Sequence, residues 1–120
     1  MNFDVTILGS SSATPIYDRH PSAQVLNIHE RFFLIDCGEG TQMQLQRYNL
    51  RFSRISHIFI SHMHGDHYFG LIGLLTSYHL LKRTARLTIF APATLEPIVQ
   101  LQLDASNTVL NYELTFIETK

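Results

Sequence analysis

A seven-residue segment, Ser-His-Met-His-Gly-Asp-His at positions 61–67, most limits what this 120-residue chain can fold into. It contains three of the seven histidines and one carboxylate. The segment follows a short, wholly apolar run at 58–60, typical of a strand buried on both faces. An apolar stretch at 67–82 comes next and predicts a buried helix. Polar clusters between such elements are where α/β folds place their sites.

The spacing within this segment predicts metal ligands. In an extended backbone, residues i and i+2 point the same way, so His62 and His64 can present their imidazoles to one ion. Gly65 permits a tight turn that brings Asp66 and His67 toward a second ion. Histidines on a loop are often merely solvated. Three histidines clustered with a carboxylate between a buried strand and a buried helix, however, favour a metal site, because the imidazoles would repel one another on protonation unless a metal stabilises their neutral form.

The expected chemistry is two-metal hydrolysis. Two ions about 3.5–4 Å apart can share a water molecule and lower its pKa. Asp66, the only carboxylate of the cluster, can both bind an ion and act as the general base. Four ligands are too few for two ions, and His79 lies about 18 Å further along the predicted helix. We therefore expect residues 1–120 to be a single, truncated domain, with the other ligands beyond Lys120 or on another chain.

The rest of the chain alternates strand and helix patterns. Short apolar runs predict strands at 3–8, 24–28, 32–35, 87–90 and 112–117, and helical patterns occupy 42–48 and 93–103. His29-Glu30 should turn a hairpin, while Thr41 and Gln44 match a capping box. The predicted class is therefore α/β or α+β, with a mixed β-sheet and helices packed on it.

Several segments resemble ribonuclease Z, the tRNA 3′-end processing endonuclease family of the metallo-β-lactamase superfamily. Residues 61–67 match the superfamily's His-x-His-x-Asp-His signature, and 36–42 (DCGEGTQ), with Leu45 and Arg47, are similar to a more discriminating ribonuclease Z segment. Residues 8–15 resemble the opening loop of the family, although Ser11 stands where a glycine is common. The glycines and leucines at 70–71 and 73–75 also fit, so the resemblance covers essentially the whole chain.

This resemblance implies the N-terminal half of an αββα sandwich, with two Zn²⁺ per complete site. His62 and His64 would bind the first zinc, Asp66 and His67 the second, and Asp66 would accept the proton. Manganese or iron can use the same donor set. The implied activity is removal of the 3′ trailer from precursor tRNA by metal-activated water, with the fragment alone inactive.

Other residues have two interpretations each. Asp36 either orients a ligand histidine by a hydrogen bond or only forms a turn before Gly38. Cys37 is expected to be a small buried side chain rather than a nucleophile. The loop at 9–12 could bind phosphate through backbone N–H groups or simply end a strand. Two basic clusters, at 47, 51 and 54 and at 82, 83 and 86, could meet RNA phosphates; for the second, compensation of a helix dipole is the simpler account.

Composition narrows the functional classes. A formal charge of −1 and a pI near 6.6 exclude a globally basic nucleic-acid binder. A single cysteine fits a cytoplasmic protein, and no segment is long and apolar enough to predict a membrane span.

Two alternative functions follow from the same sequence. A lactonase, a thioesterase or a small phosphodiesterase would keep the metal site and change the substrate. A non-catalytic fragment would instead expose an apolar face and self-associate as a homodimer, two copies stacking where the absent half belongs.

Overall fold

The computed structural model describes residues 3–9 and 22–119, which form six strands and three α-helices. Along the chain these are β1 (Phe3–Gly9), β2 (Ala23–Ile28), β3 (Arg31–Ile35), α1 (Thr41–Arg47), β4 (Ile55–Phe59), α2 (Leu71–Leu80), β5 (Leu87–Ala91), α3 (Leu95–Ala105) and β6 (Leu114–Glu118). Short 3₁₀ helices, Phe52–Arg54 and Gly65–His67, precede β4 and α2. Each predicted strand and helix is present, and none of the described helices is both long and apolar enough to cross a membrane.

The strands form one mixed sheet in sequence order, β1-β2-β3-β4-β5-β6. Pairing is antiparallel from β1 to β3 and parallel from β3 to β6. His29 and Glu30 join β2 to β3 with φ of 53° and 65°, the positive values that a tight two-residue hairpin turn requires. The predicted hairpin and the predicted fold class are both confirmed.

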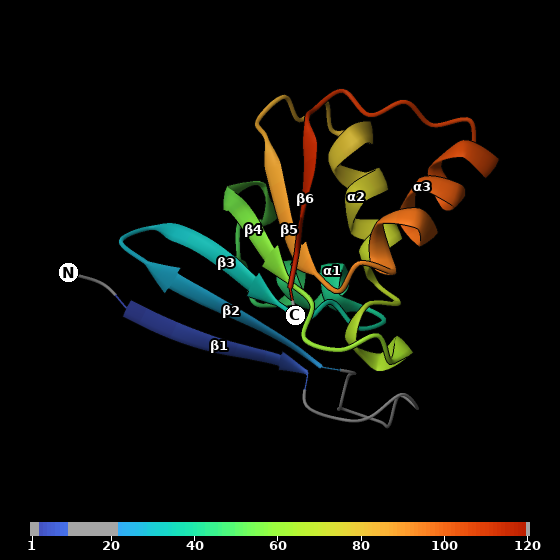
Figure 1. Ribbon diagram of the computed structural model, residues 1–120. Helices are drawn as coiled ribbons and strands as arrows, with labels where there is room; N and C mark the ends of the chain where they lie inside the picture. The colour runs from blue at the N-terminus through green and yellow to red at the C-terminus, as the bar shows by residue number, and fades with distance from the viewer. Residues whose placement is uncertain (1–2, 10–21, 120) are drawn as a thin grey trace.

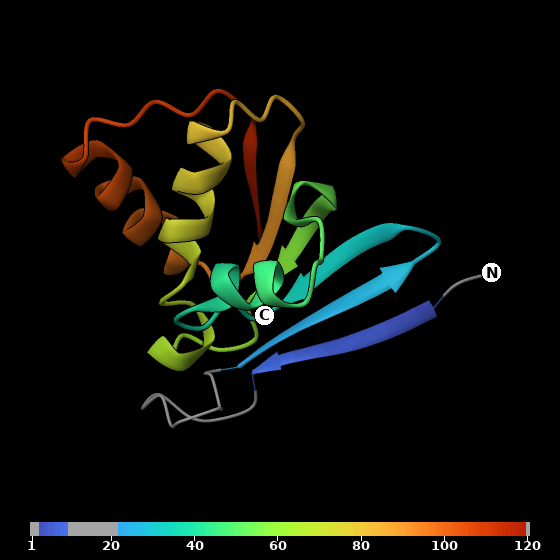
Figure 2. The same cartoon turned by 180° about the vertical axis from the view of Figure 1, so that it is seen from behind.

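Helices α1, α2 and α3 lie on one face of the sheet (Figures 1 and 2). The strands present a row of paired residues to them, with Leu34, Ile58 and Ile89 completely buried. Leu45, Leu74 and Leu95, one from each helix, pack into the same core. Burying this face is the main stabilising contribution to the fold, because each large apolar side chain contributes about 1.5–3 kcal/mol when removed from water.

The opposite face of the sheet carries no helix within the described residues. The strand register aligns one row of side chains across it, formed by Ile7, Gln24, Ile35, Phe59, Phe90 and Ile117. Phe59 and Phe90 stack with ring centroids 4.5 Å apart, and Ile7 is 58% exposed. We call this surface the open sheet face. Its row is apolar except for Gln24.

The sequence misplaced the start of α2 and the cap of α1. Helix α2 begins at Leu71 rather than His67, because the 3₁₀ turn at 65–67 and the residues after it come first. The capping box is wrong. Gly40 is the N-cap residue and no side chain caps the helix. Thr41 instead donates to the Gly38 carbonyl (2.6 Å), and Gln44 donates to the Leu8 carbonyl (3.1 Å), so tertiary partners outcompete the local cap.

Arg83 hydrogen-bonds to backbone carbonyls of neighbouring segments, a role that the sequence did not predict. Its guanidinium donates to the carbonyls of Ile55 (2.9 Å) and Arg86 (3.1 Å) and lies 4.6 Å from the centroid of the Tyr78 ring. Arg86 pairs with Glu113 at 2.8 Å. These two members of the second basic cluster therefore hold neighbouring segments together rather than facing solvent as a free basic patch.

Two buried tyrosines should make the fold sensitive to alkali. Burial raises the pKa of Tyr78 and Tyr112 well above the usual value near 10, while the nearby Arg83 lowers it. Above pH 10 the unfolded chain releases these protons and the folded chain keeps them. Stability is therefore complete below that pH and falls as the pH rises, by up to about 1.4 kcal/mol per pH unit for each group.

Tyr112→Phe tests this linkage. At pH 7 it should cost about 1 kcal/mol, because the hydroxyl donates to the Leu75 carbonyl at 2.8 Å. Between pH 10 and 11.5, urea unfolding should show a shallower loss of stability than in the unmodified chain. Tyr48→Phe, at a half-exposed ring, is the control and should leave both values unchanged. Equal alkaline slopes for all three proteins would contradict the assignment.

Candidate metal centre

Two loops at the carboxyl ends of β3 and β4 build the site (Figure 1). The loop after β3 contains residues 36–40, and the loop after β4 contains 60–70. Two backbone hydrogen bonds join them: Cys37 N–H to the His67 carbonyl (2.7 Å) and Gly70 N–H to the Cys37 carbonyl (2.9 Å). Carboxyl ends of parallel strands are where open α/β sheets place their ligands.

The three clustered histidines converge. Ring centroids are 5.1 Å apart for His62 and His67, 6.2 Å for His62 and His64, and 6.5 Å for His64 and His67. Met63, between two of them, turns inward and packs against the core, as the alternation of an extended backbone predicts. The imidazoles thus lie together at the surface.

Asp36 and Ser61 set the proton positions on two of these rings. Asp36 is buried, and its carboxylate accepts from the Ser61 N–H (2.8 Å) and the Ser61 hydroxyl (2.9 Å). The hydroxyl has given its only proton to the carboxylate, so it accepts from His62 Nδ1 at 3.0 Å. Asp36 Oδ2 also accepts from His67 Nδ1 at 2.8 Å. Both imidazoles therefore carry hydrogen on Nδ1 and leave the Nε2 lone pair free, as metal ligands do.

His67 and Asp66 place a nitrogen donor and an oxygen donor side by side. His67 Nε2 lies 3.4 Å from Asp66 Oδ2. At this separation both atoms can bind one cation, because each carries a lone pair when the imidazole is neutral. Nitrogen and carboxylate oxygen together are a common zinc donor set. Side chains of this kind therefore fit the ion that the sequence pattern implies.

The described residues include no complete three-ligand metal site. Across residues 3–9 and 22–119, no three His, Cys, Asp or Glu side chains are placed so that they could hold one ion together. The division into His62 with His64 and Asp66 with His67 stays a prediction, and the His62 ring lies nearer to that of His67 (5.1 Å between centroids) than to that of His64 (6.2 Å). A catalytic ion commonly has three protein ligands, so each pair leaves room for another.

Ser61 was missed by sequence reasoning, although it organises the site. Serine precedes many loops, and nothing in its type or position distinguishes a residue that links Asp36 to His62. Cys37 is fully buried and its pKa is raised to about 12 by burial, as expected of a small core side chain. Of the proposed phosphate loop, residues 10–12 lie outside the described part of the chain.

Among the described residues, His57, His79 and Arg54 are not part of this cluster. His57 stacks on Phe33, 5.1 Å between centroids, on the open sheet face, and buried His79 Nδ1 has no hydrogen-bond partner. Arg54 forms an exposed ion pair with Glu30 at 3.3 Å, an arrangement that contributes little to stability.

Asp36→Asn should weaken zinc binding about 10- to 100-fold, the usual effect of removing the carboxylate behind a ligand histidine. The amide cannot accept from both Ser61 and His67 as the carboxylate does. The measurement is competition of the 120-residue chain with a chromophoric zinc chelator. Glu39→Gln, the same change at an exposed residue nearby, is the matched control. Equal affinities of the two variants would mean that Asp36 only forms the turn.

The fold is that of the N-terminal part of the metallo-β-lactamase class of proteins. The structure superposes on a metallo-β-lactamase fold protein of Bacillus subtilis with a TM-score of 0.74 over 97% of this chain and 45% of that one, at 21% identity. Residues 3–114 match the family described as Anti-Pycsar protein Apyc1, and the chain belongs to that family.

The expected relation to ribonuclease Z is confirmed. The chain is 49% identical to ribonuclease Z of Phocaeicola vulgatus over 114 residues, 95% of this chain and 37% of that protein. It is 47% identical to the Bacteroides fragilis protein over 116 residues, 97% of this chain and 38% of the relative. The crystal structure of the short form of human tRNase Z matches with a TM-score of 0.83 and 39% identity, covering 95% of this chain and 44% of that one. The chain thus spans well under half the length of these relatives.

Proposed function

We propose that His62, His64, Asp66 and His67 hold two divalent cations, zinc in the first instance, within a hydrolytic centre. The observation that carries this proposal is the pair of contacts from His62 Nδ1 to Ser61 and from His67 Nδ1 to Asp36, which leave Nε2 of each imidazole available as a metal ligand. When bound, such cations lower the pKa of a water molecule and neutralise charge on the group under attack.

The residues of this chain would then have separate roles in the reaction. Asp36 and Ser61 keep the imidazoles in one tautomer and orientation. Asp66, whose carboxylate lies beside His67 at the surface, accepts the proton of the attacking water. We propose that the substrate is precursor tRNA, since the relatives at 47–49% identity are ribonucleases Z.

In this reaction, the water oxygen bonds to phosphorus as the bond from phosphorus to the tRNA 3′-oxygen breaks. The proton taken by Asp66 returns to that 3′-oxygen. The products are tRNA with a 3′-hydroxyl and a trailer with a 5′-phosphate, so both bonds and protons balance.

We further propose that residues 1–120 supply the N-terminal part of the catalytic domain. The chain covers 37–38% of the curated relatives, and each ligand pair needs at least one more donor. The 120-residue chain alone is then expected to be inactive. Metal analysis of the purified chain tests whether its half of the site is preformed: near-stoichiometric zinc supports a preformed half-site, and none supports assembly only in the longer protein.

A cleavage assay tests the substrate. The full-length protein containing this chain is incubated with precursor tRNA and with a small phosphodiester and a lactone or thioester. Trailer release at the expected bond supports the endoribonuclease. Turnover of only the small esters would favour the alternative of a lactonase, thioesterase or small phosphodiesterase.

We also propose that the protein is cytoplasmic and that the 120-residue chain associates with a second copy. The single cysteine is free and buried, as in a reduced protein. Exposed apolar side chains on both the sheet and the helices support self-association.

A further inference from the structure

Phe69 holds an aromatic ring in water two residues after His67. Its side chain is 60% exposed. Met63 and Tyr68, the other large apolar residues of the same loop, pack against the core instead. A single exposed apolar residue is common on protein surfaces, so the position of this ring relative to the candidate metal centre decides its meaning.

The Phe69 ring lies against the backbone of the loop that carries the proposed metal ligands. A Cβ built on Gly65 would overlap three atoms at the far edge of the ring, Cε1, Cζ and Cε2. The Phe69 N–H also donates to the Gly65 carbonyl at 2.9 Å. Gly65 stands between His64 and Asp66 in the sequence. The ring is therefore a direct neighbour of the backbone that bears two of the proposed ligands.

The flat face of the Phe69 ring remains available for stacking. The contact with Gly65 uses the far edge of the ring. Tyr68 meets it at 71°, with ring centroids 5.3 Å apart, which is an edge contact rather than a stack. Among the described residues, no other ring contacts Phe69. An aromatic face that no protein group covers can accept another flat group.

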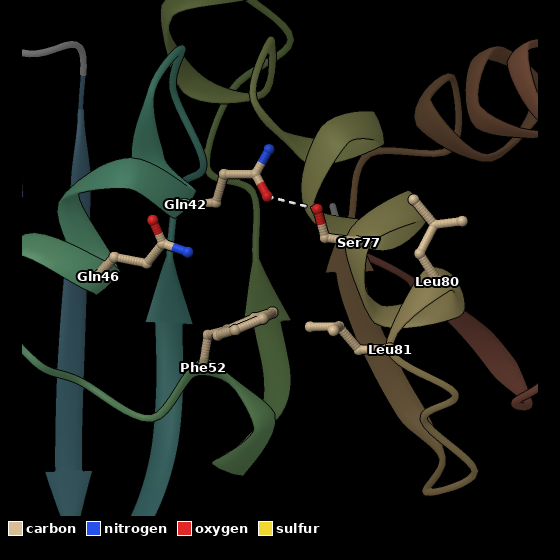
Figure 3. Close-up of a pocket in the computed structure, with 6 residues that line it drawn as sticks. All are labelled: Gln42, Gln46, Phe52, Ser77, Leu80 and Leu81. Carbon is tan, nitrogen blue, oxygen red and sulfur yellow. Dashed lines mark hydrogen bonds between the residues drawn. The ribbon is translucent and has the colours of Figure 1, made fainter.

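A second hollow, between α1 and α2, is a poorer candidate for such a contact. It measures about 210 Å³ and is lined by Gln42, Gln46, Phe52, Ser77, Leu80 and Leu81 (Figure 3). The ring among these residues, Phe52, already stacks on Tyr78 with centroids 5.1 Å apart. Phe52 also precedes β4, at the opposite end of this strand from the loop that contains the candidate metal centre.

A shallow hollow continues from Phe69 between α2 and α3. Its volume is about 120 Å³, and apolar side chains of both helices line it together with Tyr68 and Gln102. Sites for whole small-molecule ligands usually measure about 300–1,000 Å³, so this hollow suits one edge of a flat group that lies mainly on Phe69. The exposed Gln102 amide offers a donor and an acceptor to such an edge.

We propose that Phe69 is a stacking platform for the nucleobase next to the scissile phosphate of the RNA. A base is joined to its phosphate through one sugar, so a phosphate at the metal centre brings that base close to a ring on the same loop. Single-stranded RNA is commonly bound by stacking its unpaired bases on aromatic side chains. Every base has such a face, so the contact positions the strand without selecting a sequence. The inference rests on the proposed function, which supplies RNA as the substrate.

The position of Phe69 is compatible with a covering layer on the open sheet face. The short helix Gly65–His67 lies on the same side of the sheet as α2 and α3 (Figures 1 and 2). The hollow beside Phe69 is formed by these two helices. Parallel sheets are normally covered on both faces by their own domain. A layer on the open sheet face would therefore leave the Phe69 ring accessible to a substrate.

Cleavage kinetics of the full-length protein test the proposal with one intact precursor tRNA and two abasic ones. The abasic precursors lack the base directly before or directly after the scissile phosphate. Phe69→Ala should lower kcat/KM for the intact precursor about 5- to 150-fold, the effect of losing one base stack. With one of the abasic precursors, the variant and the unmodified protein should be equally fast, because no base is present to stack.

Phe3→Ala is the matched control for this experiment. Phe3 is 61% exposed on β1, outside both loops of the candidate metal centre, so its variant should cleave all three precursors at the unmodified rate. An unchanged rate of Phe69→Ala on the intact precursor would overturn the proposal. An equal loss on all three precursors would also overturn it, because the effect would not depend on a base.

Two further replacements separate stacking from folding. Phe69→Tyr keeps an aromatic face and should retain nearly full activity. Phe69→Leu keeps an apolar side chain without such a face and should be as slow as Phe69→Ala. Zinc content and urea unfolding of these variants should match those of the unmodified protein. A leucine variant as fast as the tyrosine variant would show that Phe69 only packs.

Photo-cross-linking gives a readout that does not depend on cleavage. Precursors with 5-iodouridine directly before or after the scissile phosphate are irradiated with the full-length protein. The cross-linked peptide should contain Phe69, and cross-links only to other peptides would overturn the proposal. A cross-link at Phe69 without any cleavage would support the contact and contradict the endoribonuclease. Cleavage that is insensitive to Phe69 would contradict the stacking alone, so the two proposals fail in different ways.

Discussion

Gly70→Ala is expected to lower the free energy of unfolding by at least about 3 kcal/mol and to abolish zinc binding at moderate denaturant concentrations. An added Cβ would lie 2.1 Å from the Gly38 carbonyl oxygen and 3.2 Å from the Cys37 carbonyl oxygen. Both atoms belong to the backbone, so no side-chain rotation relieves the clash. Thr41 further fixes the Gly38 carbonyl with a 2.6 Å hydrogen bond.

The substitution should also disturb the candidate metal centre, because Gly70 joins the two loops that build it. Its N–H donates to the Cys37 carbonyl at 2.9 Å, and moving the backbone away from Gly38 would break that bond. Asp36, which orients His67, precedes Cys37 in the same loop. The clash at this one glycine should therefore misplace His67.

Two other glycines provide controls. A Cβ at Gly73 would meet only the Gln42 side-chain amide at 3.0 Å, and the three atoms nearest to one at Gly65 all belong to the exposed Phe69 ring. Gly73→Ala should change stability by no more than about 1 kcal/mol, because the gain in helix propensity offsets the shift of one side chain. The measurement is urea unfolding, which compares the free energies of unfolding of the three variants. A Gly70 variant as stable as the Gly73 variant would show that the backbone at Gly70 does not lie close to the Gly38 carbonyl.

Asp66→Ala is expected to reduce precursor-tRNA cleavage by the full-length protein about 10²- to 10⁴-fold, the range for loss of a general base. Its carboxylate lies 3.4 Å from His67 Nε2, where it serves both as a ligand and as the proton acceptor. The alanine variant should also weaken binding of one zinc and leave the other bound. Single-turnover rates and zinc stoichiometry measure these two effects.

Comparison with the amide separates the two roles. Asp66→Asn keeps an oxygen that can bind a cation but cannot accept a proton. It should hold more zinc than the alanine variant and be nearly as slow. Asp104→Ala, a carboxylate at the end of α3 far along the chain, is the control and should cleave at the unmodified rate. A fully active Asp66→Ala would remove Asp66 from the mechanism.

Pattern reasoning predicted the elements well, and it failed where a partner is distant in the sequence. The strands at 58–60 and 87–90 and the helix at 93–103 appear with shifted ends. The Thr41–Gln44 capping box is absent because Gly38 and Leu8 offer these side chains better partners. Arg83 likewise reaches backbone carbonyls near β4 rather than a phosphate. Local propensity is a weak prior when tertiary contacts compete.

By itself the sequence determined the class of fold, and it predicted the chemical nature of the candidate site. The alternation of apolar runs fixes which faces must leave water, and the spacing of His62, His64, Asp66 and His67 fixes which donors stand together. Tertiary structure alone decided that Ser61 links Asp36 to His62, that Gly70 must lack a side chain, and that α1 and α2 enclose an apolar pocket. Periodicity records a residue's relation to its neighbours along the chain, whereas these contacts join segments that only folding brings together.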